Sequence, residues 1–286
     1  MTAATESGGK YYLPRPSPYP IILSAAIFLL ALGAVLDINS LGFGPWSTAA
    51  GGILFVVVLF GWFGNVIGES ESGQYRDWED RSFRLGMTWF IISEIAFFGA
   101  LFGVLFYERN ISVPGLASFD PHYTFYPGFQ ATWPSSGPLG KTFQTVQPWG
   151  IPAINTLLLL SSGVTVTWAH WGLKADKRAQ TIIGLFLTVA LGVVFLGFQA
   201  HEFHDAYTKL GLTLGTGVYG ATFFLLTGFH GLHVTLGVIM LTVILMRCIK
   251  GHFKPDQHFA FEAVSWYWHF VDVVWLGLFI FVYVLG

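Results

Sequence analysis

The run from residue 84 to 107, RLGMTWFIISEIAFFGALFGVLFY, decides the fold, because it is apolar over a membrane length and carries one carboxylate, Glu94, near its middle. At a rise of about 1.5 Å per residue, Glu94 lies about 15 Å along a helix axis from Arg84, near the centre of a ~30 Å hydrocarbon core. Placing an acidic group there costs about 2.5–3.5 kcal/mol of insertion free energy unless the group is neutral, paired or in contact with water. We therefore expect a transmembrane helix whose carboxyl group either serves a function or bonds to a neighbouring helix as a structural link.

The same run offers small side chains at spacings of three and four residues, namely Ala96, Gly99, Ala100 and Gly103. Small residues at this spacing let a second helix approach closely inside a membrane. The pattern predicts a helix-packing seam beside the carboxylate.

The composition extends this interpretation to the whole chain, which has 286 residues, of which 53% are hydrophobic and 10% charged. These values are typical of a membrane protein that crosses the bilayer several times. A net charge of −2 with few, scattered basic residues gives no case for nucleic-acid binding. Cys248 is the only cysteine, which excludes an intrachain disulfide and paired-thiolate metal sites.

Seven apolar runs are long enough to span a membrane. They cover residues 20–36, 46–67, 84–107, 150–173, 180–201, 217–247 and 261–285. Residues 1–19 are polar and Pro-rich without a signal-peptide pattern, and we expect a cytoplasmic N-terminal segment there. Residues 68–83 would form a cytoplasmic loop, and residues 108–149 a structured loop on the outer face.

Lysine and arginine divide unequally between the two sides that seven spans define. Eleven of the 14 fall on the side of the N-terminus, and only Arg109, Lys141 and Lys209 fall on the other. The positive-inside rule therefore predicts a cytoplasmic N-terminus and a C-terminus outside.

Two histidines three residues apart, His230 and His233, share one helix face and suggest a metal or haem site. A six-coordinate haem needs ligands on both of its sides, so a residue such as His269 from another helix would have to contribute. Histidines bonded to backbone or hydroxyl groups are the simpler interpretation. A second possible metal cluster consists of His201, Glu202, His204 and Asp205, although its spacing differs from that of H-E-x-x-H. The alternative is a helix end in contact with water.

The last apolar run carries a polar stripe of Glu262, Ser265, His269 and Asp272. At about 100° per residue these four side chains fall within about 80° of each other. The stripe must face protein or water rather than lipid, and His269 could pair with Asp272. It is either an interior packing surface or part of a proton path.

Aromatic and basic side chains stand where the spans meet the cytoplasmic interface, among them Trp62, Trp168, His170, Trp171 and Arg247. Such residues ordinarily anchor helices at the lipid headgroups. The sharper interpretation is specific phospholipid binding, which requires a groove.

Four segments together resemble one family, subunit III of the haem–copper cytochrome c oxidases. They are RLGMTWFIISEIAFF (84–98), INTLLLLSSGVTVTWAH (154–170), VYGATFFLLTGFHGLHVTLGV (218–238) and HFAFEAVSWYWHFVDVVWLGLFIFVYVLG (258–286). The resemblance covers nearly the whole chain from residue 46 onward. Gly64, Asn65 and Gly68 depart from the family pattern after Trp62, and His201 and His204 are not family features.

The resemblance implies an all-α membrane protein of seven transmembrane helices, in which bundles 20–67 and 84–286 are separated by a lipid-filled cleft. It implies no haem or copper in this chain; those cofactors belong to partner subunits, the catalytic subunit I and the copper-bearing subunit II, and cytochrome c serves the complex. Glu94 falls on a family glutamate that reacts with carbodiimides and lies towards the proton-uptake side. Phospholipid contacts are implied for Trp62, Phe63, Glu69 and Arg247.

The chain is therefore expected to be a non-catalytic subunit that stabilises the catalytic subunit of a proton-pumping oxidase, binds phospholipid and supports proton uptake through Glu94. The membrane would be the bacterial cytoplasmic or the mitochondrial inner membrane. A stand-alone proton-coupled transporter using Glu94 and the polar stripe is the first alternative, and a haem-binding electron carrier using His230, His233 and His269 is the second.

Overall fold

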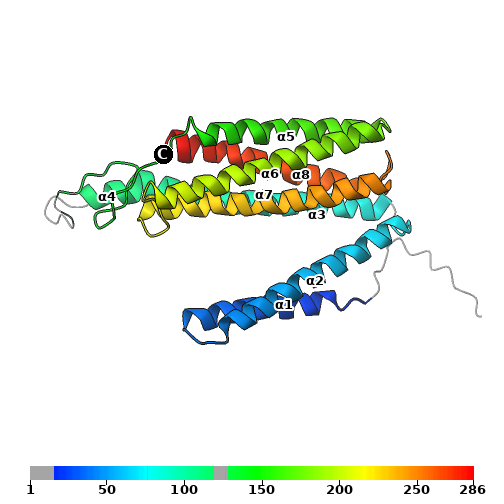
Figure 1. Cartoon of the computed structure of the whole chain (residues 1–286), viewed down its shortest axis with the longest axis horizontal. Helices are drawn as coiled ribbons and strands as arrows, with labels where there is room; N and C mark the ends of the chain where they lie inside the picture. Colours follow the sequence, from blue (N-terminus) through cyan, green and yellow to red (C-terminus); the bar gives the residue numbers. More distant parts are fainter. Residues whose placement is uncertain (1–15, 76, 119–125, 127) are drawn as a thin grey trace, which may run out of the picture. The chain divides into compact units, whose positions relative to one another are not determined.

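Membrane-length helices account for most of the computed structural model, which describes residues 16–75, 77–118, 126 and 128–286. Seven helices in this part of the chain are long and apolar enough to cross a membrane (Figure 1). They are built on α1 (Tyr19–Ile38), α2 (Gly44–Glu71), α3 (Asp77–Tyr107), α5 (Ile151–Lys174), α6 (Arg178–Thr208), α7 (Val218–Lys250) and α8 (Phe259–Leu278). The described residues contain no strand, so the prediction of an all-α membrane protein with seven spans is confirmed.

Several helices continue past the apolar runs that predict them. α3 begins at Asp77 rather than at residue 84, and Asp77, Glu79 and Asp80 suit its first turn because carboxylates stabilise the positive end of a helix. α3 also continues through a π-helical turn, η1 (Glu108–Ser112), into α4 (Val113–Ser118). The start of the predicted outer loop 108–149 is therefore helical, a correction to the sequence-based boundary.

Three of the segments predicted from the sequence lie partly outside the described residues. Residues 1–15 of the predicted N-terminal segment, Arg76, and residues 119–125 and 127 of the predicted outer loop lie outside the described residues. The chain divides into two compact units, residues 1–83 and 84–286, and each is described by itself.

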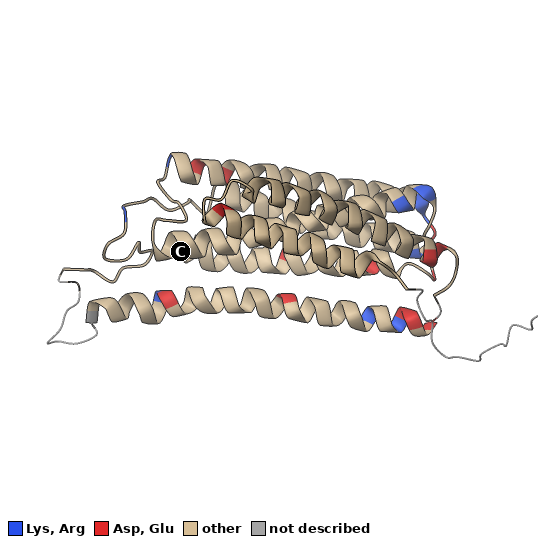
Figure 2. Cartoon of the chain, turned by 90° about the horizontal axis from the view of Figure 1, so that it is seen from below, with Lys and Arg blue, Asp and Glu red and all other residues tan. Residues whose placement is uncertain are grey.

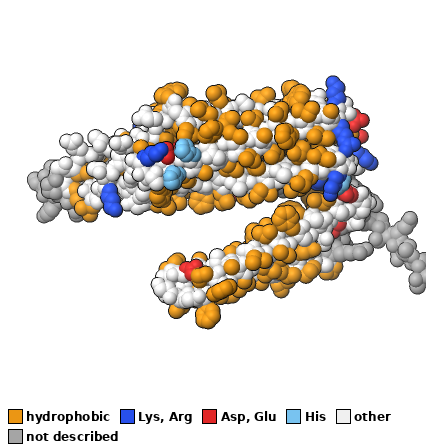
Figure 3. Space-filling view, in the orientation of Figure 1, with side chains coloured by type: hydrophobic (Ala, Val, Ile, Leu, Met, Phe, Trp, Pro, Cys, Tyr) orange, Lys and Arg blue, Asp and Glu red, His pale blue; other side chains and the backbone are white. Residues whose placement is uncertain are grey.

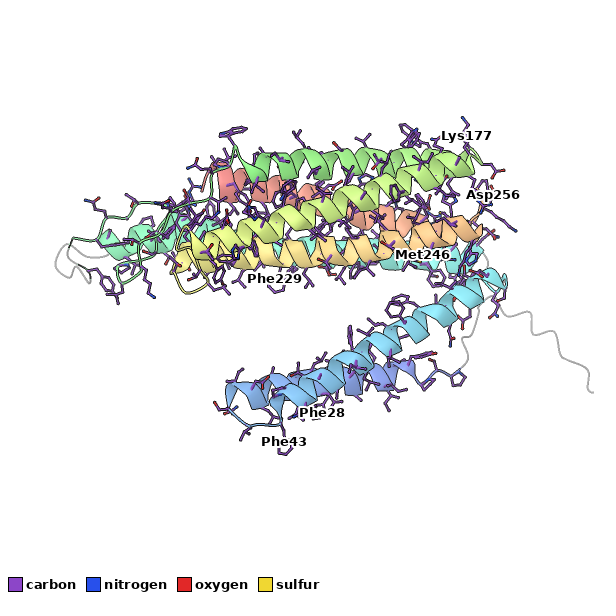
Figure 4. All side chains as sticks on the ribbon, viewed as in Figure 1. Phe28, Phe43, Lys177, Phe229, Met246 and Asp256 are labelled. Carbon is purple, nitrogen blue, oxygen red and sulfur yellow. The ribbon has the colours of Figure 1, made fainter. Side chains whose placement is uncertain are left out.

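The first unit is a hairpin of α1 and α2 that depends on small residues at its contact. A Cβ added to Gly51 would lie 2.7 Å from the Leu30 nitrogen and 2.9 Å from the Ala26 oxygen, so the two backbones meet directly. The Ser47 hydroxyl donates to the Leu29 carbonyl at 2.8 Å across the hairpin. Large apolar side chains such as Phe28 and Phe43 are exposed, as expected of surfaces in contact with lipid (Figure 4).

The second unit is a closed ring of four helices in which α5 packs on α6, α6 on α7, α7 on α8, and α8 on α5. The core of this ring is aromatic, with Trp268, Trp275 and Phe195 fully buried. The rings of Phe195 and Trp275 meet edge to face at 4.8 Å between centroids, a preferred geometry for aromatic pairs. α3 joins the ring through aromatic contacts, including Phe97 with Phe229 of α7 at 5.0 Å.

Glycines let the helices close around these large side chains. A Cβ on Gly237 of α7 would lie 2.7 Å from the Trp268 ring, and one on Gly192 of α6 would lie 2.9 Å from the same ring. By contrast, no atom lies within 4 Å of a Cβ built on Gly99 or Gly103. Within the described part of the second unit, the expected seam of α3 is therefore not covered by another helix.

Most lysines and arginines of the second unit lie at one end, where Figure 2 shows blue at the ends of its helices. Figure 4 labels Lys177, between α5 and α6, and Asp256, between α7 and α8, at this same end. We call it the basic end; it carries Arg84, Lys174, Lys177, Arg178, Arg247, Lys250 and Lys254. The sides of the helices in view are covered mainly by hydrophobic side chains (Figure 3).

Candidate functional site

The carboxylate of α3 meets a histidine of α7 in the middle of the second unit. His233 Nε2 lies 3.0 Å from Glu94 Oε2, and the two side chains are 12% and 20% exposed. α3 positions Glu94 near the centre of its apolar run, and the α7 sequence GFHGLH brings His233 to the same level. The cost of a carboxyl group at membrane depth is thus lowered by a partner on a second helix.

The other nitrogen of His233 fixes how this pair can hold protons. His233 Nδ1 lies 2.6 Å from the Phe229 carbonyl oxygen, which can only accept, so Nδ1 carries a hydrogen. A neutral His233 then presents the lone pair of Nε2 to Glu94, and the carboxyl group must be the donor. If the proton moves to Nε2, the pair becomes an imidazolium and a carboxylate. In both forms His233 and Glu94 share one proton and have no net charge.

Aromatic rings pack around the His233 side of the pair. The His233 ring packs against Phe98 at 5.0 Å, Phe97 at 6.2 Å and Tyr267 at 6.3 Å between centroids. The Tyr267 hydroxyl donates to the His233 carbonyl oxygen at 3.3 Å. This apolar surrounding strengthens the interaction between the two groups, because the local dielectric constant is low.

His230 is directed elsewhere than His233, although the two share a helix face. It is fully buried, and its Nε2 lies 3.2 Å from the Val271 carbonyl oxygen of α8. Its ring packs against Trp275 at 5.1 Å and Phe195 at 5.8 Å between centroids. His230 thus bonds to a backbone group, while His233 bonds to Glu94. The Nε2 atoms of the two histidines therefore do not face a common ligand.

The polar stripe of α8 is buried at Glu262, Ser265 and Asp272. Ser265 donates to the Phe261 carbonyl oxygen of its own helix at 2.9 Å. Glu262 lies at the basic end, where Arg84 of α3 pairs with its Oε2 and stacks over the Phe259 ring at 5.4 Å. Stacking and charge pairing together favour arginine at this position.

His269 differs from the rest of the stripe because its side chain is 45% exposed. It lines a groove of about 550 Å³ between α5 and α8, together with Thr167, Trp168 and Trp171. A Cβ on Gly163 of α5 would overlap the Asp272 carboxylate and would lie 3.5 Å from His269 Nδ1, so this glycine leaves room for Asp272 beside the ring. His269 Nδ1 lies 3.7 Å from Asp272 Oδ2, and its Nε2 lies 3.2 Å from Thr167 Oγ1.

The residues expected to contact phospholipid lie in both units. In the first unit Trp62 stacks on Tyr19 at 6.2 Å between centroids, Phe63 is exposed, and Glu69 accepts a hydrogen bond from Tyr75 at 2.7 Å. In the second unit Arg247 is buried at the basic end and lies over the Phe253 ring at 4.5 Å.

The cluster at the opposite end of α6 does not converge on one point. Glu202 is buried and accepts a hydrogen bond from Tyr283 at 2.6 Å. Asp205 pairs with Lys209 at 2.8 Å, and His201 lies 3.8 Å from the same carboxylate. Within the described residues, the group that brings three possible metal ligands together is instead His170, His258 and Glu262. Sequence reasoning missed it, although His258 and Glu262 stand four residues apart at the start of one helix.

The comparisons with known proteins agree along nearly the whole length of the chain. The family described as Cytochrome c oxidase subunit III matches residues 9–286. "Cytochrome c oxidase subunit 3" of Prototheca wickerhamii is 40% identical over 96% of this chain and 97% of its own length. The protein of that name from Hippopotamus amphibius is 38% identical over 99% of both chains. "Probable cytochrome c oxidase subunit 3" of Rickettsia conorii is 37% identical over 96% of this chain and 93% of its own. The chain belongs to the cytochrome c oxidase subunit III family.

Proposed function

We propose that the chain acts as the non-catalytic subunit III of a proton-pumping oxidase that reduces oxygen to water, and that Glu94 supports proton uptake there. Full-length likeness to proteins of that name supports the first part. The Glu94–His233 contact supports the second part, because it holds a titratable pair near the middle of an apolar unit. Neither comparison nor geometry favours a stand-alone transporter.

The pair is suited to take up and release single protons. It is uncharged while it holds one proton, so its resting form suits an apolar position. A second proton would make it cationic, and loss of the proton would leave a carboxylate beside a neutral imidazole. Proton transfer between Glu94 Oε2 and His233 Nε2 requires no movement of either helix, because the two atoms are already in hydrogen-bond contact.

The partners in this proposal are the catalytic subunit I, the copper-bearing subunit II and phospholipids, with cytochrome c as the donor to the complex. Haem and copper would reside in those other subunits. The small residues Ala96, Gly99, Ala100 and Gly103 of α3 would suit the close approach of another helix, since no described helix of the second unit covers Gly99 or Gly103. The phospholipid role of Trp62, Phe63, Glu69 and Arg247 is part of the same proposal.

The orientation is also a proposal. The basic end would face the cytoplasm of a bacterium or the matrix of a mitochondrion, because short loops rich in lysine and arginine stay on that side. The N-terminus would then lie on the cytoplasmic side and the C-terminus on the opposite side.

The test replaces Glu94 by Gln and by Ala in the chain as it is expressed with its partners. We expect unchanged haem content, together with slower proton uptake in single-turnover measurements or fewer turnovers before inactivation. Glu108→Gln is the matched control, since Glu108 follows α3 at its far end, away from the His233 contact. Normal proton uptake and normal lifetime in both Glu94 variants would refute the role of Glu94.

Purification in mild detergent tests the assignment as a subunit. Haem–copper oxidase subunits should copurify, and the visible haem spectrum should leave with them when harsher detergent strips them. A colourless chain that purifies alone and moves protons in liposomes would support the transporter. A chain that keeps a Soret band after its partners are removed would support the electron carrier.

A further inference from the structure

Two histidines and a glutamate meet at the basic end of the second unit, away from the Glu94–His233 pair. His170 lies in the last turns of α5, His258 directly precedes α8, and Glu262 lies in the first turn of α8. All three side chains are largely buried, with 18%, 8% and 12% exposed. Residues from α5, from α8 and from the position just before α8 are thus held together by the packing of α5 against α8.

The distances between the three facing atoms match the edges of a metal coordination tetrahedron. His170 Nε2 and His258 Nε2 are 3.2 Å apart, His258 Nε2 and Glu262 Oε1 are 3.3 Å apart, and His170 Nε2 and Glu262 Oε1 are 3.6 Å apart. Zinc binds nitrogen and carboxylate oxygen at about 2.0–2.2 Å in tetrahedral geometry, which places neighbouring ligand atoms about 3.3–3.6 Å from each other.

The hydrogen bond of His258 prepares it as a ligand. Its Nδ1 lies 3.2 Å from the Lys254 carbonyl oxygen, which can only accept. With the hydrogen on Nδ1, a neutral His258 directs the lone pair of Nε2 towards His170 and Glu262. A backbone carbonyl that holds the far nitrogen in this way is the usual second contact of metal-binding histidines.

Glu262 uses its two oxygens for different partners. Arg84 pairs with Oε2, so Oε1 stays directed at the histidines. With one carboxylate, two imidazoles and the cations Arg84 and Lys174 nearby, the cluster is a poor site for calcium or magnesium, which require several oxygens. Imidazole ligands instead suit zinc and related transition metals.

We propose that His170 Nε2, His258 Nε2 and Glu262 Oε1 form a binding site for a zinc-like divalent cation at the basic end, with water as the fourth ligand. The partial exposure of His170 and Glu262 gives the cation access from the aqueous side of this end. The site belongs to residues of this chain and does not rest on the proposed oxidase function.

The test measures zinc bound to the purified full-length chain, with whatever partners copurify, after chelator treatment and equilibrium dialysis against Zn²⁺. His170→Asn and His258→Gln should each remove one bound zinc per chain or weaken its affinity at least tenfold. His201→Gln is the control, because His201 is exposed at the opposite end of the second unit, where its Nε2 lies 3.8 Å from Asp205 Oδ2. It should bind as much zinc as the original chain.

Zinc X-ray absorption on the original chain gives a second measurement that does not depend on how the variants fold. In the original chain we expect the zinc spectrum to show two imidazole ligands. In the His170→Asn chain, if that chain assembles, we expect it to show one. Equal zinc content and affinity in the original chain and both histidine variants would overturn the proposal. A bound zinc without imidazole in its coordination shell would overturn it as well.

Discussion

His233 Nε2 lies 3.0 Å from Glu94 Oε2, although 139 residues separate the two in the chain. Groups that share one proton act as a unit, so their substitutions are not additive. We predict that Glu94→Gln and His233→Asn each slow proton uptake or shorten the working lifetime, and that the double variant is no worse than the worse single one. Single-turnover proton uptake in the four members of the cycle checks this. Additive losses in the double variant would show that the two side chains act separately.

Gly237 allows α7 to lie directly on the Trp268 ring. We predict that Gly237→Ala lowers the free energy of unfolding of the second unit by about 1–3 kcal/mol, because the new Cβ would overlap a fully buried ring. Gly231→Ala on the same helix is the control, since a Cβ there meets nothing within 4 Å.

Cys248 provides the measurement for this comparison. It is the only cysteine and is buried on α7, so a maleimide should label it in this chain only when the second unit opens. Labelling during heating, followed by mass spectrometry, should give a lower midpoint temperature for Gly237→Ala than for Gly231→Ala. Equal midpoints would contradict the packing argument.

The Trp268 indole is tied to α5 by one hydrogen bond, from Nε1 to Ser162 Oγ at 2.8 Å. We predict that Ser162→Ala lowers the free energy of unfolding by about 0.5–2 kcal/mol, since the buried N–H loses its acceptor. Ser161→Ala is a matched control because the neighbouring serine is exposed. The same Cys248 labelling measures both variants, and an equal effect of the two would rule out a role for the bond.

The sequence predicted the seven helices because each carries an apolar run of membrane length, a property of composition alone. It placed their ends less well, since hydropathy marks the lipid-facing part and helices continue into polar turns. The start of α3 at Asp77 could have been predicted from the acidic residues of its first turn. The helical start of the 108–149 segment was harder to predict, because it contains Pro114 and proline usually ends a helix. Here Pro114 stands in the first turn of α4, where a helix tolerates proline.

The candidate site was predictable only in part. Glu94 stands out by its depth in an apolar run, but its partner depends on which faces of α3 and α7 meet, and the sequence leaves that open. His230 and His233 look equivalent in the sequence, yet one bonds to Val271 and the other to Glu94. The place of the Asp272 carboxylate depends on the missing side chain of Gly163 on another helix, and the meeting of His170 with His258 depends on the packing of α5 against α8.

The Glu202–Tyr283 hydrogen bond lies near the end of the ring opposite to the basic end, and both side chains are buried. Removing one partner of a buried polar pair leaves the other without its hydrogen bond, which costs about 1–3 kcal/mol. We predict that Tyr283→Phe lowers the temperature of Cys248 labelling, because the Glu202 carboxyl group loses its donor. Adding Glu202→Leu should restore part of this loss, since a buried pair replaced by apolar groups can be nearly neutral.

Tyr207→Phe is the control for this pair, because Tyr207 is 46% exposed and packs against Phe224 through its ring, which the substitution keeps. It should leave the labelling temperature unchanged. If Tyr283→Phe behaves like Tyr207→Phe, the hydrogen bond contributes no measurable stability. If adding Glu202→Leu lowers the labelling temperature further, Glu202 stabilises the second unit through contacts other than the one with Tyr283. The hydrogen bond would then not explain why both residues are buried.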